Sequence, residues 1–128
     1  AHPKHTFLWI PSAKTITGGV EVFDNTHVWM ADTQSVESRK AWLTHLEKME
    51  ALSPKEVIPG HYLGDARFDK RAIAFTRDYI NAFEKAAKTA KDSADLIAKM
   101  LKLYPQIPLD AGLEISAKVI MGEMRWPM

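Results

Sequence analysis

The first third of the chain alternates short apolar runs with turn residues. Runs rich in β-branched and aromatic residues are typical of strands, and the dipeptide Asp24–Asn25 is typical of a turn. The runs are Phe7–Ile10, Thr15–Thr17, Val20–Phe23 after Gly18–Gly19, and His27–Met30. The pattern therefore predicts strands and turns over this part of the chain.

A helical pattern follows the capping residues Ala31–Ser35. Apolar residues recur there at spacings of three and four, whereas charged residues, Arg39 among them, occupy the opposite face. The apolar positions are Trp42, Leu43, Leu46, Met49 and Leu52. Ser53–Pro54 ends this helix, because the residue before a proline is disfavoured in helical conformation. Val57–Ile58 then predicts a strand that runs into a turn over residues 59–62.

The carboxyl-terminal third has the pattern of several helices. One apolar stripe runs from about Asp69 to Ala90, and Asp92 or Ser93 can cap a shorter helix that Pro105 ends. A last helix is expected to begin at Asp110. The fold class predicted from these elements is α/β, more closely an α+β arrangement of strands, one helix, one further strand ending in Pro-Gly-His, and helices.

Composition and charge limit the class of protein further. The 128 residues are 46% hydrophobic and 26% charged, which predicts one soluble globular domain over residues 1–128. The formal charge is +1 and no basic run occurs, so a nucleic-acid partner is not expected. The absence of cysteine excludes disulfides and thiol chemistry, and no run of about 18 apolar residues predicts a membrane span. The compartment, cytoplasm or periplasm, stays open.

The segment Pro59-Gly60-His61 is the strongest local indication of chemistry. It follows a predicted strand, so it places an imidazole at the carboxyl end of a sheet, where ligands and metals gather in α/β folds. Gly60 permits a close backbone approach that a side chain would block. His61 is therefore a candidate metal ligand or base, with a hydrogen-bonded histidine in a surface turn as the alternative.

An ordered series of motifs resembles the second half of a metallo-β-lactamase-fold hydrolase. The resemblance covers nearly all of the chain and includes Arg77–Tyr79 and Tyr104–Pro105. The motifs that carry it are Thr6–Ser12, Gly18–Val20 with Val22–Phe23, His27–Trp29, Trp42–Leu43 and Val57–His61. The resemblance implies one half of a four-layer αββα sandwich. It also implies a metal-dependent hydrolase, usually with two zinc ions, that cleaves an ester, lactone, lactam or similar bond of a small molecule.

The resemblance assigns only one metal ligand to this chain. His61 matches the final histidine ligand of the family, but the family's His-x-His-x-Asp-His motif does not occur, and Gly19 stands where the family has a bridging aspartate. The nearby Asp24 and Asp32 are interpreted as turn and cap residues. Because a catalytic zinc needs three protein ligands, we expect the chain alone to bind zinc weakly or not at all, to contain no catalytic residue and to be inactive.

The other histidines and Trp29 have two interpretations each. His27 and Trp29 are candidate substrate-binding residues at the mouth of a pocket, whereas Trp29 could instead be a core or dimer-interface aromatic. His45 is expected to be solvated on the polar side of its helix. His2 and His5 are expected to be exposed near the chain terminus.

Two functions from different classes remain open. The first is a fragment or separate half of a metal-dependent hydrolase. A lone half would expose one apolar sheet face, so we expect a homodimer, which could be domain-swapped, or association with the missing amino-terminal half. The second is a non-catalytic interaction or dimerisation module that keeps the fold half without its metal site. An unrelated α+β domain is a third possibility, favoured if His61 is buried and hydrogen-bonded away from any cavity.

Overall fold

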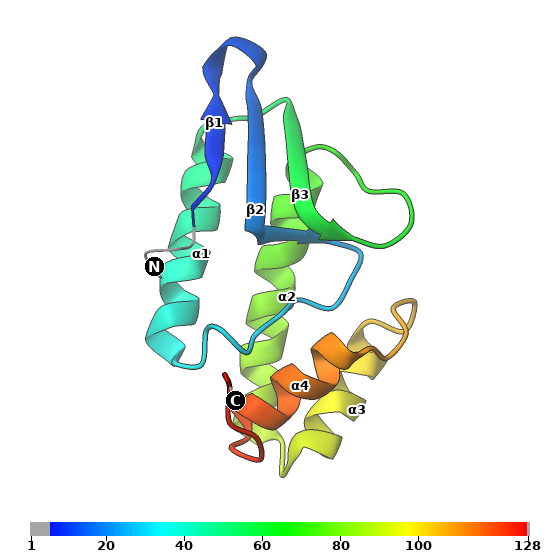
Figure 1. Cartoon of the computed structure of the whole chain (residues 1–128). Coiled ribbons are helices and arrows are strands. Elements are labelled where there is room, and N and C mark those ends of the chain that lie inside the picture. The colour runs from blue at the N-terminus through cyan, green and yellow to red at the C-terminus, as the bar shows by residue number, and fades with distance from the viewer. Residues whose placement is uncertain (1–5, 128) are drawn as a thin grey trace.

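The fold combines one small sheet with four helices in the part of the chain that the structure, a computed structural model, describes, which is residues 6–127. Figure 1 shows the sheet lying against α1 and α2, with α3 and α4 beyond its far end. The predicted mixed α/β class is confirmed at this coarse level. His2 and His5, predicted to be exposed, lie outside the described residues.

The sheet contains an antiparallel and a parallel pair of strands. Strand β1 (Leu8–Ile10) pairs antiparallel with β2 (Thr15–Asp24) after the short 3-10 turn η1 (Pro11–Ala13), and β2 pairs parallel with β3 (Glu56–Tyr62). A parallel pair needs a crossover connection, and α1 provides it. The two predicted runs on either side of Gly18–Gly19 join into the single strand β2.

Two expectations about the strands are wrong. Residues 59–62, predicted as a turn, continue β3, because Pro59 and His61 are opposite Gly19 and Phe23 of β2. A proline is tolerated there because β3 is at the edge of the described sheet. His27–Met30 belongs to neither a strand nor a helix, although Val28 and Met30 are buried in the core.

The four helices follow the sequence pattern closely. They are α1 (Val36–Ala51), α2 (Lys70–Thr89), α3 (Ser93–Leu103) and α4 (Ala111–Ile120). Each begins after a residue whose side chain accepts a backbone N–H of the first turn, namely Ser35, Asp69, Asp92 and Asp110. Within residues 6–127, no helix has the length and hydropathy that a membrane crossing requires.

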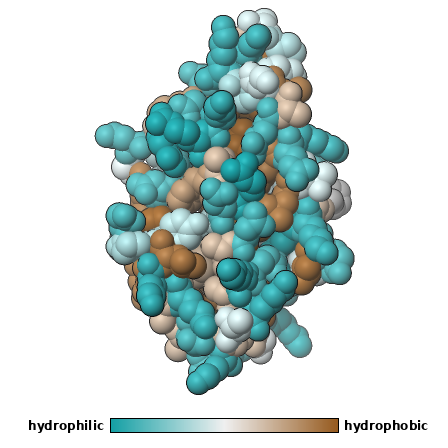
Figure 2. Space-filling model, turned by 180° about the vertical axis from the view of Figure 1, so that it is seen from behind, coloured by the Kyte–Doolittle hydropathy of each residue, from teal (hydrophilic) through white to brown (hydrophobic). Residues whose placement is uncertain are grey.

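The two faces of the sheet differ in what covers them. The inner row Trp9, Ile16 and Val57 faces the core, where Ile16 and Val57 are fully buried with α2 residues such as Phe83. The neighbouring outer row is Leu8, Thr17 and Ile58, and Leu8 and Ile58 are 59% and 37% exposed. Figure 2 shows the opposite, helical side of the molecule, which is mostly hydrophilic. The sheet therefore has an apolar outer face that no described element covers.

Two polar side chains of α1 are not solvated as the sequence pattern predicts. His45 is half-buried, and its Nδ1 lies 2.9 Å from Oε1 of Glu21, whose carboxylate is fully buried. Arg39 is buried, donates to the carbonyl oxygen of Thr33 over 2.6 Å and pairs with Glu84 of α2. The solvated interpretation of His45 is therefore wrong, because a buried carboxylate needs a donor.

Gly60 allows β2 and β3 to approach each other. A Cβ atom on residue 60 would lie 2.1 Å from the carbonyl oxygen of Gly19, which is too close for any pair of nonbonded atoms. The close approach predicted for Gly60 is thus present between the strands.

A Gly60→Ala substitution is expected to lower the free energy of unfolding by about 2–3 kcal/mol, because the new methyl group must push β3 from β2. Glu56→Ala, at the exposed start of the same strand, is the matched control and should change stability by less than about 0.5 kcal/mol. Denaturant unfolding checks both values, and equal stability of the two variants would contradict the assigned pairing.

Candidate functional site

A cavity of about 450 Å³ lies where β2 and β3 approach α4, and it gathers every residue that the sequence proposed for a site. His61, His27 and Trp29 all line it, although they come from β3 and from the loop after β2. The complete lining is Val20, Phe23, Thr26, His27, Trp29, Asp32, Trp42, His61, Asp110 and Gly112.

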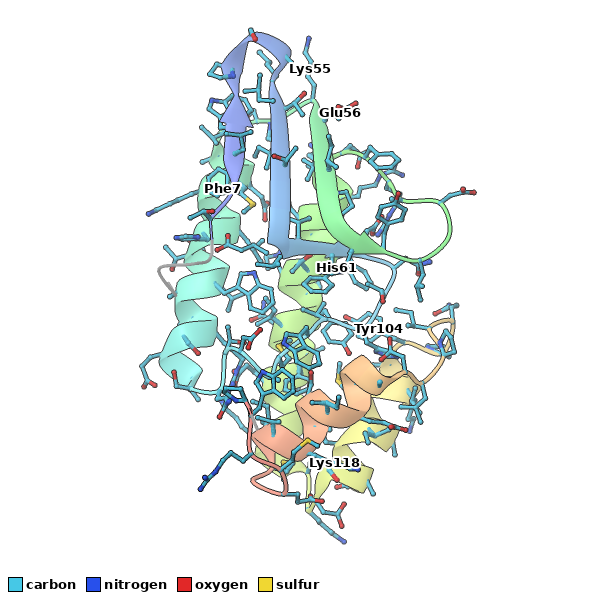
Figure 3. All side chains as sticks on the ribbon, viewed as in Figure 1. Phe7, Lys55, Glu56, His61, Tyr104 and Lys118 are labelled. Carbon is cyan, nitrogen blue, oxygen red and sulfur yellow. The ribbon has the colours of Figure 1, made fainter. Side chains whose placement is uncertain are left out.

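His61 is held by its ring face. His61 on β3 lies opposite Phe23 on β2, and the two rings are stacked with their centroids 4.9 Å apart. The residue is exposed, and within residues 6–127 neither ring nitrogen makes a hydrogen bond. Figure 3 shows His61 at the end of β3 toward α4, opposite the end that carries Lys55 and Glu56. Its nitrogens are therefore open to a ligand.

His27 is in a different environment from His61. It is 4% exposed, its Nδ1 lies 2.8 Å from the hydroxyl oxygen of Tyr79, and its Nε2 lies 3.3 Å from the carbonyl oxygen of Ile107. Because a carbonyl only accepts, Nε2 carries the proton and Nδ1 accepts from the tyrosine hydroxyl in the neutral ring. Desolvation by burial lowers the pKa of His27, and the negative charge of Asp110 raises it by a smaller amount. His27 is thus a neutral wall of the cavity.

Trp29 belongs to a cluster that includes the end of the described chain. Its Nε1–H donates to Oδ2 of Asp32 over 2.9 Å, and the Nε1–H of Trp126 donates to Oδ1 over 3.0 Å. The two indoles meet edge to face with centroids 5.1 Å apart. Trp29 therefore both lines the cavity and packs against a second aromatic side chain.

The two aspartates near the strands fit the turn and cap roles expected from the sequence only in part, because Asp32 lies in a turn but does not cap α1. Asp32 binds the two indoles, while Ser35 is the cap of α1. Asp24 is the last residue of β2, is fully buried and receives hydrogen bonds from Arg67, with Nη2 2.6 Å from Oδ1. The turn role falls instead to Asn25, which has a φ of 51°.

Sequence reasoning missed Asp110 as a residue of the site. It predicted this residue correctly as a helix cap, and Oδ1 accepts from the backbone N–H of Leu113 over 2.8 Å. The same residue lines the cavity and influences the pKa of His27. No local pattern connects Asp110 with residues more than eighty positions earlier, so only the tertiary structure brings it there.

The described residues do not by themselves fit a zinc ion. Across residues 6–127, no three side chains of His, Asp or Glu come together in a way that could hold a metal. Gly19 has no carboxylate and has a φ of +53°, a conformation that side chains rarely adopt. Within residues 6–127, His61 is therefore the candidate ligand that keeps an open imidazole at the cavity.

Comparison of the chain with protein-family models and with curated proteins found no match.

The burial of neutral His27 predicts a pH dependence of stability. The unfolded chain protonates this histidine near its ordinary pKa of 6.5, whereas the folded chain resists protonation, so the free energy of unfolding should fall as pH drops below about 6.5. The slope from this residue is at most about 1.4 kcal/mol per pH unit. Denaturant unfolding between pH 8 and pH 5 measures it.

The matched comparison is between His27→Asn and His61→Asn. The variant at the buried position should lose part of the pH dependence, whereas the variant at the exposed position should keep the slope of the natural chain. Identical slopes in all three proteins would show that His27 does not carry the effect.

Proposed function

We propose that this chain is one half of a metal-dependent hydrolase similar to the metallo-β-lactamase fold. The observation that carries the proposal is the cavity at the end of the parallel strands, where His61, His27 and Trp29 lie together. These are the residues to which the resemblance gives a metal-binding and a substrate-binding role. An exposed imidazole beside a mostly apolar cavity suits the binding of a small molecule next to a metal.

In this proposal the chain's own residues have separate tasks. His61 offers a ring nitrogen to a zinc ion whose other ligands come from a segment or copy outside this chain. His27, fixed by Tyr79 and Ile107, and Trp29, fixed by Asp32, form the wall against which a small-molecule substrate is oriented. When bound, the metal would supply activated water and Lewis acidity for cleavage of an ester, lactone or lactam bond.

The uncovered outer face of the sheet supports the idea of a missing complement. Leu8 and Ile58 are exposed in one row, and Ile10, two residues from Leu8 on β1, adds a 37% exposed apolar side chain. Sheets that pack face to face bury such rows. We propose that a second sheet covers this face, supplied by the amino-terminal half or, for the chain alone, by a second copy.

The oligomeric state of the chain tests the covered face. Size-exclusion chromatography with light scattering at micromolar concentration should show a dimer of the chain alone, and Leu8→Lys should shift it to monomer. Leu103→Lys on α3, whose side chain is 56% exposed against 59% for Leu8, is the matched control and should leave the dimer intact. A well-folded natural chain that stays monomeric would contradict the proposal.

Metal binding tests the hydrolase itself. In a polypeptide that joins this chain to a segment with the His-x-His-x-Asp-His motif, we expect stoichiometric zinc and zinc-dependent ester or lactone hydrolysis. His61→Ala should weaken zinc affinity at least about tenfold. Lys55→Ala at the other end of β3 should not (Figure 3). Tight stoichiometric zinc in the chain alone would contradict the single-ligand assignment.

One observation favours a non-catalytic interaction module as the second candidate. Gly19 is in a left-handed conformation and carries no carboxylate, so the bridging ligand that the resembled family uses is missing. An interaction module would form the same dimer through its outer sheet face. It would show neither zinc binding nor hydrolysis in the joined polypeptide, which separates it from the hydrolase.

A further inference from the structure

The charge of the cavity beside His61 differs from that of three other cavities in the described part of the chain. The chain has 17 Lys and Arg residues, yet within residues 6–127 none of them lines this cavity, whereas Asp32 and Asp110 both do. Three other cavities each contain three basic side chains. They are Lys55, Lys70 and Arg71 in the first, Lys85, Lys99 and Lys102 in the second, and Arg39, Lys40 and Lys88 in the third. Carboxylates also line two of these cavities, Glu50 and Asp69 in the first and Glu84 in the third, but the basic side chains outnumber them there. Among the residues that the structure describes, the cavity beside His61 is thus the one of the four whose charged aspartate and glutamate side chains have no basic side chain beside them.

The cavity is also rich in aromatic rings. Phe23, Trp29 and Trp42 line it together with the imidazoles of His27 and His61. Aromatic rings attract cations through the negative charge of their faces, and tryptophan does so most strongly. Aromatic rings combined with carboxylates are the surroundings in which quaternary and protonated amines are bound in proteins.

The amino terminus of α4 works against this preference, but it is the weaker effect. Gly112 of its first turn lines the cavity, and a helix amino terminus carries about half a positive charge. Two carboxylates exceed that charge. Asp110 in addition uses Oδ1 to accept the N–H of Leu113, so this helix end is already capped by the cavity's own carboxylate.

The two carboxylates are held in place by the protein. Asp32 is fixed by the indole N–H groups of Trp29 and Trp126, and Asp110 by the backbone of α4. These donors are neutral, and within residues 6–127 neither Asp32 nor Asp110 forms a salt bridge with a basic side chain. A site with fixed charges needs little reorganisation to bind a cation, which favours affinity.

We propose that this cavity binds a cationic amine, a protonated or quaternary ammonium group, and that such a group is part of the substrate. This inference rests on the proposed function, because it names the class of substrate that the same cavity of the proposed hydrolase would bind. The cationic group would be placed by Asp32, Asp110 and the aromatic wall, and the bond to be cleaved would lie toward His61.

The test is a titration of the 128-residue chain with choline, followed by proton–nitrogen NMR of the indole N–H groups. Choline should shift the signals of Trp29 and Trp42, and its neutral isostere 3,3-dimethylbutan-1-ol at the same concentrations should bind at least about fivefold more weakly. Equal binding of the two compounds, or stronger binding of acetate, would overturn the proposal. Shifts confined to other residues would also overturn it.

Charge-neutral variants locate the effect. Asp110→Asn keeps a good helix cap, and Asp32→Asn keeps an acceptor for an indole, so both should fold and raise the dissociation constant for choline about fivefold. Asp65→Asn, an exposed residue outside the cavity that causes the same change in net charge, should leave it unchanged. An equal effect of all three variants would show only a general charge effect and refute the site.

This experiment uses no metal, so its outcome is separate from that of the proposed function. Choline binding with no zinc binding in the joined polypeptide would retain the cation site and refute the hydrolase. Zinc-dependent hydrolysis without choline binding would retain the hydrolase and refute the cation site.

Discussion

The parallel pairing of β2 with β3 is the constraint on which the cavity depends. Between Gly19 and Phe23, β2 advances four residues, while β3 advances two from Pro59 to His61. The extra residues form an irregularity of the kind that re-aims side chains beside functional sites. Here it turns Val20 outward, buries Glu21 and brings His61 onto Phe23. Only a glycine fits at position 60, where a Cβ atom would meet the backbone of Gly19.

The irregular part of β2 is fixed by side chains of α1, so the position of this helix affects the site. The buried carboxylate of Glu21 accepts a hydrogen bond from His45. The backbone carbonyl oxygen of Glu21 accepts a second one from Nε1–H of Trp42 over 2.9 Å. Trp42 is therefore held in a set orientation while it lines the cavity. Removing His45 would leave the buried carboxyl group of Glu21 without this hydrogen-bond partner, which costs more stability than losing a surface contact. Glu21, His45 and Trp42 thus contribute at once to core packing, to the hydrogen bonding of buried polar groups and to the geometry of the cavity.

The sequence predicted what depends on neighbouring residues and missed what depends on distant ones. Helix starts at Asp69, Asp92 and Asp110 could be predicted because a cap and its helix are adjacent. His45 and Asp24 could not be placed, because their partners lie 24 and 43 residues away. Pro59 and Gly60 indicate a turn locally, yet Gly60 is needed for contact between strands. The gathering of His61, His27 and Trp29 at one cavity agrees with their proposed roles, but their chemistry stays a prediction.

The histidines of the described chain differ in what they can still bind, and this difference decides how the site can act. His27 has both nitrogens engaged, and His45 uses Nδ1 for a buried carboxylate. His61 contacts the protein through its ring face, so within residues 6–127 it is the histidine with both nitrogens open. Within residues 6–127, no three histidine or acidic side chains come together to hold a metal ion, so a metal bound at this imidazole would need ligands from beyond these residues. The same sheet leaves exposed apolar side chains, Leu8 and Ile58, on its outer face, so the proposed covering partner and the proposed external ligands could be tested together on one complex.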